Sequence, residues 1–336
     1  MKTGKVPENI LKRAVLRQAG RKTGDIQSGA GVGKDCAIFP SGGEAALACC
    51  MQEAVVRTAA YEGCGTAGEN FMTVGGLIRK CANNLAAGGS RPLAVMLTLL
   101  LPENTEEAVL RGLMEEAADT CGELGMEIVG GQSRVTAAIL APVAVTAGYG
   151  RPWKTGRCTG KAEPGQDVVF SKWAGLQGTA ALARRHREGL LGRYPAYIVE
   201  EAACFDRYLS VLKEAEAAVR YGVGAMHDAS EGGIFGALWE LGEGAGAGLR
   251  IDMRKIPLRQ ETVEVCEYCG VNPYELMSGG CLVMTAEDGP GLAAALEAEG
   301  IPATVVGKVT AGSGRLLVNG EEIRYMNRPA RDGIYL

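Results

Sequence analysis

The sequence predicts an α+β fold built from two domains. Its 336 residues suffice for about two domains of roughly 150 residues each. Amphipathic helical patterns and short apolar runs alternate in both halves of the chain, which is typical of mixed α and β layers. A polar stretch rich in Gly and Pro separates the halves at residues 150–156. We therefore place the N-terminal domain at residues 1–152 and the C-terminal domain at residues 153–336.

The N-terminal half contains one strongly amphipathic helix at residues 105–124, where apolar residues recur three and four apart. Asn104, with Glu107 three residues later, predicts a capped start, and Gly125 predicts the end. Apolar runs of strand length flank this helix at residues 93–101, 126–129 and 137–146. The expected order is strand, helix, strand, strand.

The C-terminal half begins with a short apolar run at residues 168–170 after Pro164 and Gly165. Apolar residues on one face predict a long helix at residues 199–221, and a second helix follows Gly233. Closing strands are expected at residues 281–285 and 304–309.

Composition excludes several classes of protein. The net charge is −4, without the basic face that nucleic-acid binding needs. No apolar run is long enough to cross a membrane, and the N-terminus lacks the apolar centre of a secretory signal. We therefore expect a cytoplasmic protein that binds neither nucleic acid nor membrane.

The cysteines indicate reduced thiols rather than disulfides. There are eleven, an odd number, and most lie within apolar segments as small core residues do. Cys266 and Cys269 form a single C-x-x-C, and the only histidines are His186 and His227. A zinc site needs a second pair of ligands, so structural cysteines are the better interpretation.

Glycine is the unusual component, with 49 residues against 18 aromatic ones (3 Trp, 10 Tyr, 5 Phe). The segment Ser28–Asp35 matches neither a P-loop nor a dinucleotide fingerprint. It presents Lys34 and Asp35 on a flexible loop, whose backbone N–H groups can cradle a phosphate while Asp35 helps to hold Mg²⁺. An ordinary hairpin is the alternative.

Two further glycine pairs adjoin polar residues. Gly130–Ser133 ends an expected strand, and Asp228–Gly233 opens an expected helix. A glycine-rich helix N-terminus can bind an anion, although Asp228 or Ser230 can equally be a helix cap. His227 beside Asp228 lacks the nucleophile of a catalytic triad, so we interpret it as a packing or hydrogen-bonding histidine.

These segments, taken in order, resemble the aminoimidazole ribonucleotide (AIR) synthase-related superfamily, particularly its branch of the hydrogenase maturation factor HypE. Each segment is similar to a motif of that superfamily, from a G-x-G-x-D loop to a D-P-T-E/R-G-G helix start. The matching segments are Gly31–Ile38, Cys81–Pro92, Gly130–Val135, Gly178–Ala180 and Asp228–Gly233.

The resemblance implies an N-terminal α+β domain that forms a homodimer with its twin, beside a C-terminal α/β domain. It also implies ATP and Mg²⁺ as cofactors. The residues that it assigns to cofactor binding are Gly33, Lys34, Asp35, Gly130, Gly131, Gln132, Ser133, Gly178, Thr179, Asp228, Glu231, Gly232 and Gly233. The residues that it assigns to the metal are Asp35, Glu53 and Asn84.

The chain departs from the family pattern at both metal and tail positions. Glu53 and Asn84 stand where the family has Asp, and a neutral Asn weakens metal affinity because it cannot offset cation charge. The HypE branch ends in a cysteine that receives a carbamoyl group, whereas this chain ends in Arg328–Leu336 without one. We expect that this chain cannot perform the tail chemistry in the same way.

Three functions remain open at this point. The first is ATP-dependent activation, by phosphorylation and dehydration, of a carbonyl or carbamoyl oxygen on a small molecule or a protein partner. The second is a non-catalytic, nucleotide-binding or regulatory homodimer of the same fold. The third is AIR synthesis in purine biosynthesis.

Overall fold

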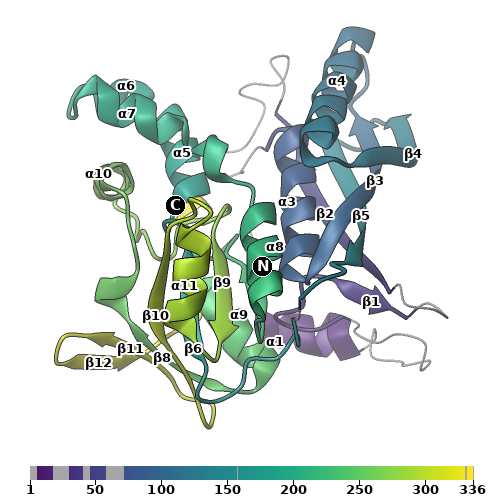
Figure 1. Cartoon of the computed structure of the whole chain (residues 1–336). Helices are drawn as coiled ribbons and strands as arrows, with labels where there is room; N and C mark the ends of the chain where they lie inside the picture. The colour runs from purple at the N-terminus through teal and green to yellow at the C-terminus, as the bar shows by residue number, and fades with distance from the viewer. Residues whose placement is uncertain are drawn as a thin grey trace.

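The computed structural model describes residues 6–17, 30–40, 46–57, 72–156, 158–329 and 331–335. Two mixed sheets, each with its own helices, form the two halves of the molecule (Figure 1). None of the helices in these ranges is long and apolar enough to cross a membrane. The expected α+β class with two mixed halves is confirmed.

The N-terminal half is a five-stranded sheet in the order β1-β2-β5-β3-β4. All neighbouring strands are antiparallel except β3 and β4, which are parallel. A short helical segment, α1 (Glu8–Ile10) and η1 (Leu11–Leu16), precedes it. The other elements are β1 (Ala37–Phe39), β2 (Leu47–Val55), α3 (Val74–Ala87), β3 (Ser90–Leu101), α4 (Glu107–Leu124), β4 (Glu127–Val135) and β5 (Val143–Pro152).

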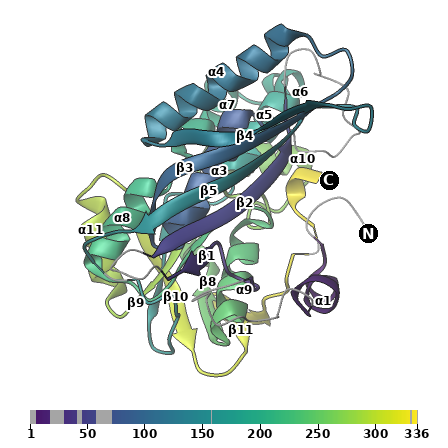
Figure 2. The same cartoon turned by 90° about the vertical axis from the view of Figure 1, so that its right-hand side faces the viewer.

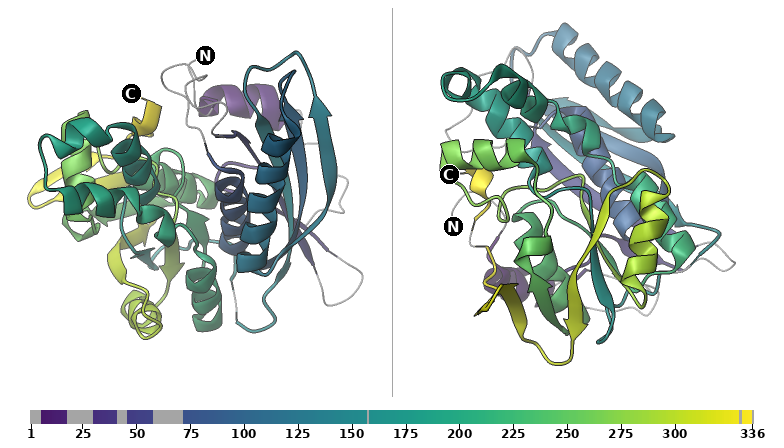
Figure 3. Two further views of the ribbon diagram at one scale, coloured as in Figure 1. Left: turned by 90° about the horizontal axis from the view of Figure 1, so that it is seen from above. Right: turned by 60° about the vertical axis from the view of Figure 1, so that its left-hand side comes forward.

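Helices α3 and α4 cover one face of this sheet, and its opposite face points away from the C-terminal half (Figures 2 and 3). The side chain of Thr73 caps α3 by accepting a hydrogen bond from the backbone N–H of Gly76 at 3.0 Å. Nearly every face of α3 is buried, because the sheet and α4 pack against it in the N-terminal half and α8 (Leu212–Tyr221) contacts it from the C-terminal half. Helix α3 therefore joins the two halves.

The C-terminal half is a seven-stranded sheet in the order β12-β11-β8-β10-β6-β9-β7. Its strands are β6 (Asp167–Ser171), β7 (Met226–Asp228), β8 (Gly248–Asp252), β9 (Leu282–Ala286), β10 (Ala303–Thr310), β11 (Arg315–Asn319) and β12 (Glu322–Tyr325). Its remaining helical elements are α5 (Leu176–Arg185), α6 (Arg187–Leu191), α7 (Ala196–Ala203), η3 (Phe205–Tyr208), α9 (Gly233–Ala245), η4 (Met253–Lys255), α10 (Gln260–Cys269), α11 (Gly289–Glu297) and η5 (Gly333–Tyr335).

The expected helix at residues 105–124 is confirmed as α4, but its predicted cap is wrong. Asn104 adopts a left-handed backbone with φ of 62°, and α4 begins after Glu106 without a side-chain cap. The helix ends at Gly125, whose φ of 64° permits the left-handed turn. The strand expected at residues 137–146 instead begins at Val143.

The single helix predicted at residues 199–221 is wrong, since the chain forms α7, η3 and α8 there. Lys172 donates hydrogen bonds to the main-chain carbonyls of Tyr208 (2.8 Å) and Ser210 (2.7 Å). Asn83 on α3 donates to the carbonyl of Leu209 at 2.7 Å. These bonds satisfy backbone groups that a continuous helix would pair internally, so tertiary contacts interrupt the helix.

Candidate functional site

The glycine loop of the N-terminal half (residues 30–35) packs against α9 of the C-terminal half. Gly33 has a φ of +69°, and a Cβ at this position would lie 2.2 Å from the main-chain oxygen of Glu240. Only glycine accepts both that conformation and that contact. The neighbouring Ser28 and Gly29 of the predicted loop lie outside the described residues. The close approach brings Asp35 to the C-terminal half.

Asp35, His227 and Glu240 form a bridge between the halves. The imidazole Nδ1 of His227 lies 2.8 Å from Asp35 Oδ2, and its Nε2 lies 3.0 Å from Glu240 Oε2. The side chain of His227 is only 6% exposed, that of Asp35 11% and that of Glu240 15%. Burial lowers the pKa of His227, but the charges and hydrogen bonds of the two carboxylates outweigh it and raise the pKa to about 10. An imidazolium that donates to both carboxylates fits this geometry, and the predicted hydrogen-bonding role of His227 is confirmed.

A cavity of about 550 Å³ adjoins this bridge. Its wall carries the cationic side chains of Lys34, Lys80 and Arg328 and the oxygen-bearing side chains of Asp35 and Asn84. Residues of the glycine loop, of the middle of β2 and of the segment 227–230 complete the wall. The cavity therefore combines cations, a glycine-rich loop and oxygen-bearing side chains in one place.

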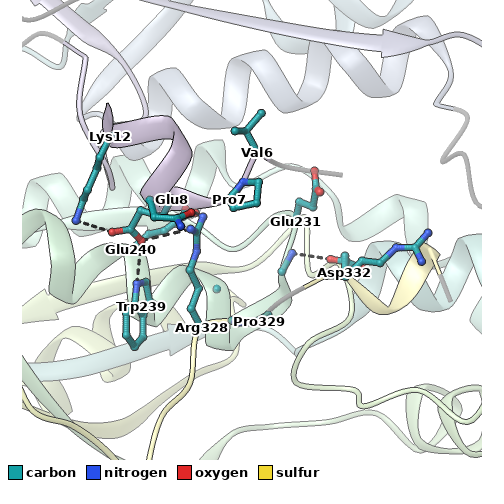
Figure 4. A pocket seen from close by; sticks show the side chains of 14 residues that line it. Val6, Pro7, Glu8, Lys12, Glu231, Trp239, Glu240, Arg328, Pro329 and Asp332 are labelled. Carbon is teal, nitrogen blue, oxygen red and sulfur yellow. Dashed lines mark hydrogen bonds and ion pairs between the residues drawn. The ribbon is translucent and has the colours of Figure 1, made fainter. Parts of the chain in front are cut away.

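A second cavity of about 480 Å³ shares Val6, Glu240 and Arg328 with the first (Figure 4). Glu8 organises this region, because its carboxylate accepts from the indole N–H of Trp239 at 3.2 Å and pairs with Lys12 at 2.6 Å. Arg328 reaches the same carboxylate at 3.4 Å. The N-terminal helical segment and the irregular segment that follows β12 thus form adjoining walls.

The N-terminus of α9 binds a carboxylate of this chain. Asp332 Oδ2 accepts the backbone N–H of Gly232 at 2.6 Å, and its Oδ1 accepts those of Met277 (3.1 Å) and Ile334 (2.9 Å). Burial raises the pKa of Asp332 to about 6, although these N–H donors act in the opposite direction. The anion-binding geometry expected here thus exists, and Asp332 occupies it.

Some of the other residues of the Asp228–Gly233 segment line one of the two cavities, and the others are buried in the interior. Glu231 and Gly232 line the second cavity, and Ser230 lines the first. Asp228 ends β7 and is buried. Gly233 is packed so closely that a Cβ would lie 2.5 Å from the main-chain oxygen of Tyr274.

Two predicted segments lie outside both cavities. Gly130–Ser133 runs along β4, the exposed edge strand of the five-stranded sheet. Gly178 and Thr179 lie in α5, where a Cβ on Gly178 would meet Leu276 Cδ1 at 2.4 Å. The hydroxyl of Thr179 bonds that of Thr262 at 3.1 Å. Within a single copy of the chain, these segments do not meet Asp35.

The three residues predicted to bind metal are not brought together. Asp35 and Asn84 line the same cavity, whereas Glu53 is an exposed residue of β2 that lines neither cavity. Within the described ranges, no group of three or more His, Cys, Asp or Glu side chains is arranged to hold a metal ion. Of the three predicted metal ligands, only Asp35 and Asn84 could therefore hold a metal in this cavity, together with oxygens of a bound ligand.

Several cavity residues were not singled out from the sequence. Glu240 lies on α9, Lys80 on α3, and Arg328 beyond the last strand. None belongs to a short motif, and each reaches the site through the packing of separate elements. The weak signal available was the acidic character of Glu240 in a largely apolar helix.

The fold and site together define a two-domain α+β protein with a cationic, glycine-bordered cavity between its halves. Residues 33–151 match the family described as AIR synthase related protein, N-terminal domain, and residues 163–319 match its C-terminal domain. The chain belongs to the AIR synthase-related family.

Known relatives agree with this assignment. The chain is 33% identical over 236 residues to carbamoyl dehydratase HypE of Rhodobacter capsulatus, an alignment covering 68% of this chain and 67% of the relative. A HypE–HypF complex contains a similar structure, with a TM-score of 0.72, 18% identity, and coverage of 94% of this chain and 100% of the other. HypE in complex with ATP has a TM-score of 0.69 at 17% identity and covers 100% of this chain and 98% of the other.

Proposed function

We propose that the chain binds ATP with Mg²⁺ in the 550 Å³ cavity and activates a carbonyl or carbamoyl oxygen by phosphorylation, so that the oxygen leaves as phosphate. The observation that carries the proposal is the convergence of Lys34, Asp35 and Asn84 on one cavity. They come from two of the segments that resemble family motifs, Gly31–Ile38 and Cys81–Pro92. The proposal locates the protein in the cytoplasm, where ATP is available.

The residues present fit this ligand. Backbone of the glycine loop, with Lys34 and Lys80, supplies the donors and positive charge that phosphates need. Asp35 and Asn84 would hold Mg²⁺, which is usually bound by one or two carboxylates together with phosphate oxygens. When bound, the ion would neutralise phosphate charge. Phosphoryl transfer depends mainly on such positioning and electrostatic stabilisation.

The names of the relatives support the same chemistry. One relative is a carbamoyl dehydratase, and a HypE of similar fold was solved with ATP. A further similar structure is a complex of HypE with HypF, which favours a protein partner over a free small molecule as the source of the carbonyl group. On this basis a role in hydrogenase maturation is part of the proposal.

The proposal includes a homodimer formed by the uncovered face of the five-stranded sheet. On this face Met51 is 68% exposed and Met96 is 41% exposed, and Ala147 lies between them in register. A second copy would bury these side chains and bring its own Gly130–Ser133 to the interface. Light scattering should give a dimer for the wild type and a monomer for Met96→Lys, while a monomeric wild type would contradict this arrangement.

Calorimetric titration of ATP with Mg²⁺ tests the binding site. We expect binding by the wild type and at least a tenfold weaker affinity for Asp35→Ala. The control Glu322→Gln, on β12 of the other sheet, should bind as the wild type does. Equal heats for Asp35→Ala and the wild type would overturn the proposed location.

Glu53→Gln tests the full set of residues predicted to bind metal. A weaker dependence of ATP binding on Mg²⁺ would support Glu53 as a ligand. An unchanged dependence would reduce the set to Asp35 and Asn84.

One observation favours the non-catalytic alternative. The neutral Asn84 lines the cavity where the family carries a carboxylate, which reduces the negative charge available to a metal ion. This alternative predicts ATP binding without phosphate release, so steady ATP turnover with a carbamoylated peptide would eliminate it. Turnover of formylglycinamidine ribonucleotide would instead support AIR synthesis.

A further inference from the structure

A group of thiols borders the 550 Å³ cavity. Cys36, Cys49 and Cys50 line its wall, and Cys81 lies behind Cys50. The Sγ atoms of Cys50 and Cys81 are 3.4 Å apart, and the Cys50 thiol also lies 3.3 Å from the main-chain oxygen of Cys81. This pair joins β2 to α3, and neither sulfur takes part in the function proposed above.

Gly148 provides the space in which the two sulfurs meet. It pairs with Cys50 across β2 and β5, and a Cβ at this position would lie 2.5 Å from Cys81 Sγ and 3.5 Å from Cys50 Sγ. A disulfide needs an S–S distance of about 2.05 Å, so the sulfurs must approach by roughly 1.4 Å. With no side chain on Gly148, small rotations of the two cysteine side chains are not blocked from that side.

The two thiols differ in access and in acidity. Cys50 borders the cavity and is 7% exposed, whereas Cys81 is fully buried. The hydrogen bond from Cys50 lowers the pKa of Cys81, burial raises it, and Thr146 and the Gly148 N–H lower it further, so the net shift is downward. The same contact raises the pKa of Cys50. Cys50, which borders the cavity, is therefore the member that a reagent reaches first.

We propose that Cys50 and Cys81 are a redox-active dithiol that a small disulfide, such as oxidised glutathione, oxidises through the cavity. The sulfur of Cys50 attacks the reagent to form a mixed disulfide, and the first glutathione thiolate leaves and takes up the Cys50 proton. The sulfur of Cys81 then attacks Cys50 Sγ, and the second glutathione thiolate leaves and takes up the Cys81 proton. The dithiol is thus oxidised to a disulfide and the reagent is reduced to two thiols.

Oxidation would covalently fix β2 to α3 in the wall of the cavity. Cys81 lies one helical turn before Asn84 on α3, so a cavity residue is coupled to the bond. A ligand that fills the cavity should also shield Cys50 from the reagent. That protection rests on the proposed nucleotide site, whereas formation of the disulfide does not.

Mass spectrometry of the folded full-length chain tests the proposal. We expect oxidised glutathione to produce a peptide pair linked through Cys50 and Cys81, reversible by dithiothreitol. Cys81→Ser should accumulate the mixed disulfide on Cys50, because the resolving thiol is absent. Cys49→Ser, which keeps both members of the pair, should form the link as the wild type does.

Cys204 provides an internal standard, since it is an exposed thiol. If Cys204 becomes fully glutathionylated while Cys50 and Cys81 stay reduced, the proposal is wrong. It is also wrong if the linked peptide appears only after unfolding in urea. Both readouts use the wild type, so they stand even where Cys81→Ser fails to fold. ATP with Mg²⁺ should slow formation of the link at least threefold, and an unchanged rate would contradict the nucleotide location while leaving the dithiol intact.

Discussion

Replacement of His227 by alanine tests the bridge between the two halves. The imidazole is 6% exposed and contacts Asp35 at 2.8 Å and Glu240 at 3.0 Å. His227→Ala leaves two largely buried carboxylates without their shared cation. Breaking a buried ion pair by removing one partner costs about 3–5 kcal/mol. Glu240 retains Arg328 at 3.9 Å, so most of the loss falls on Asp35.

A double-mutant cycle isolates this contribution. Unfolding in urea, followed by tryptophan fluorescence, should give a coupling free energy between Asp35→Ala and His227→Ala of about 1.5–3 kcal/mol, the range for hydrogen bonds to charged groups. The exposed pair Arg187 and Glu200 is the control, with a coupling below about 1 kcal/mol. Additive effects of Asp35→Ala and His227→Ala would refute the bridge.

Three further predictions follow from other contacts in the structure. Gly33→Ala should abolish ATP binding and lower the midpoint of urea unfolding, because its Cβ would lie 2.2 Å from the main-chain oxygen of Glu240. The control is Gly125→Ala, which also has a positive φ but meets nothing within 4 Å. It should lower the free energy of unfolding by only about 1–2 kcal/mol and leave ATP binding unchanged. Asn83→Ala should lower the free energy of unfolding by about 1–3 kcal/mol, because it leaves buried backbone groups unpaired, whereas Asn84→Ala should weaken ATP binding more than stability. In the folded protein the pKa of Asp332 is about 6, above its ordinary value of 3.8, so the folded state holds the carboxyl proton more tightly than the unfolded state does. The contribution of Asp332 to the free energy of unfolding is therefore full below pH 3.8 and is lost as the pH rises through 6. Asp332→Asn should remove that part of the pH dependence in urea unfolding, and an unchanged profile would contradict the assignment.

The spacing of apolar residues predicted a helix correctly where that spacing alone determines which face of the helix is buried. The apolar spacing of residues 105–124 predicted α4, since Leu113, Ala117 and Cys121 form its buried stripe. The same reasoning failed at residues 199–221, although the apolar spacing there is comparable. Lys172 and Asn83 bind the carbonyls of residues 208–210 from outside, and no window of local sequence contains both of those partners.

The candidate site was likewise predictable only in part, namely for the residues that lie in short sequence motifs. The loop ending in Lys34 and Asp35 was found from its glycines, and Asn84 from the order of motifs, and these residues do line one cavity. Glu240 supplies both the carboxylate opposite His227 and the carbonyl against Gly33. Its role depends on how α9 packs against the N-terminal half, which residue spacing within either half does not encode.

The glycine excess has two physical causes that look alike in sequence. At Gly33, the missing side chain lets a cavity loop approach the backbone of α9, whereas at Gly178 it lets α5 pack against Leu276 in the interior. Both positions lie in segments that resemble family motifs, yet only Gly33 borders a cavity. Close packing and ligand binding both require backbone to approach another group closely, and glycine satisfies either requirement. A glycine motif therefore indicates close approach, and the charged or oxygen-bearing side chains beside it decide whether the approaching group is a ligand. Lys34 and Asp35 supply such side chains next to Gly33, while Gly178 is followed by Thr179, whose hydroxyl is bonded to Thr262 within the interior.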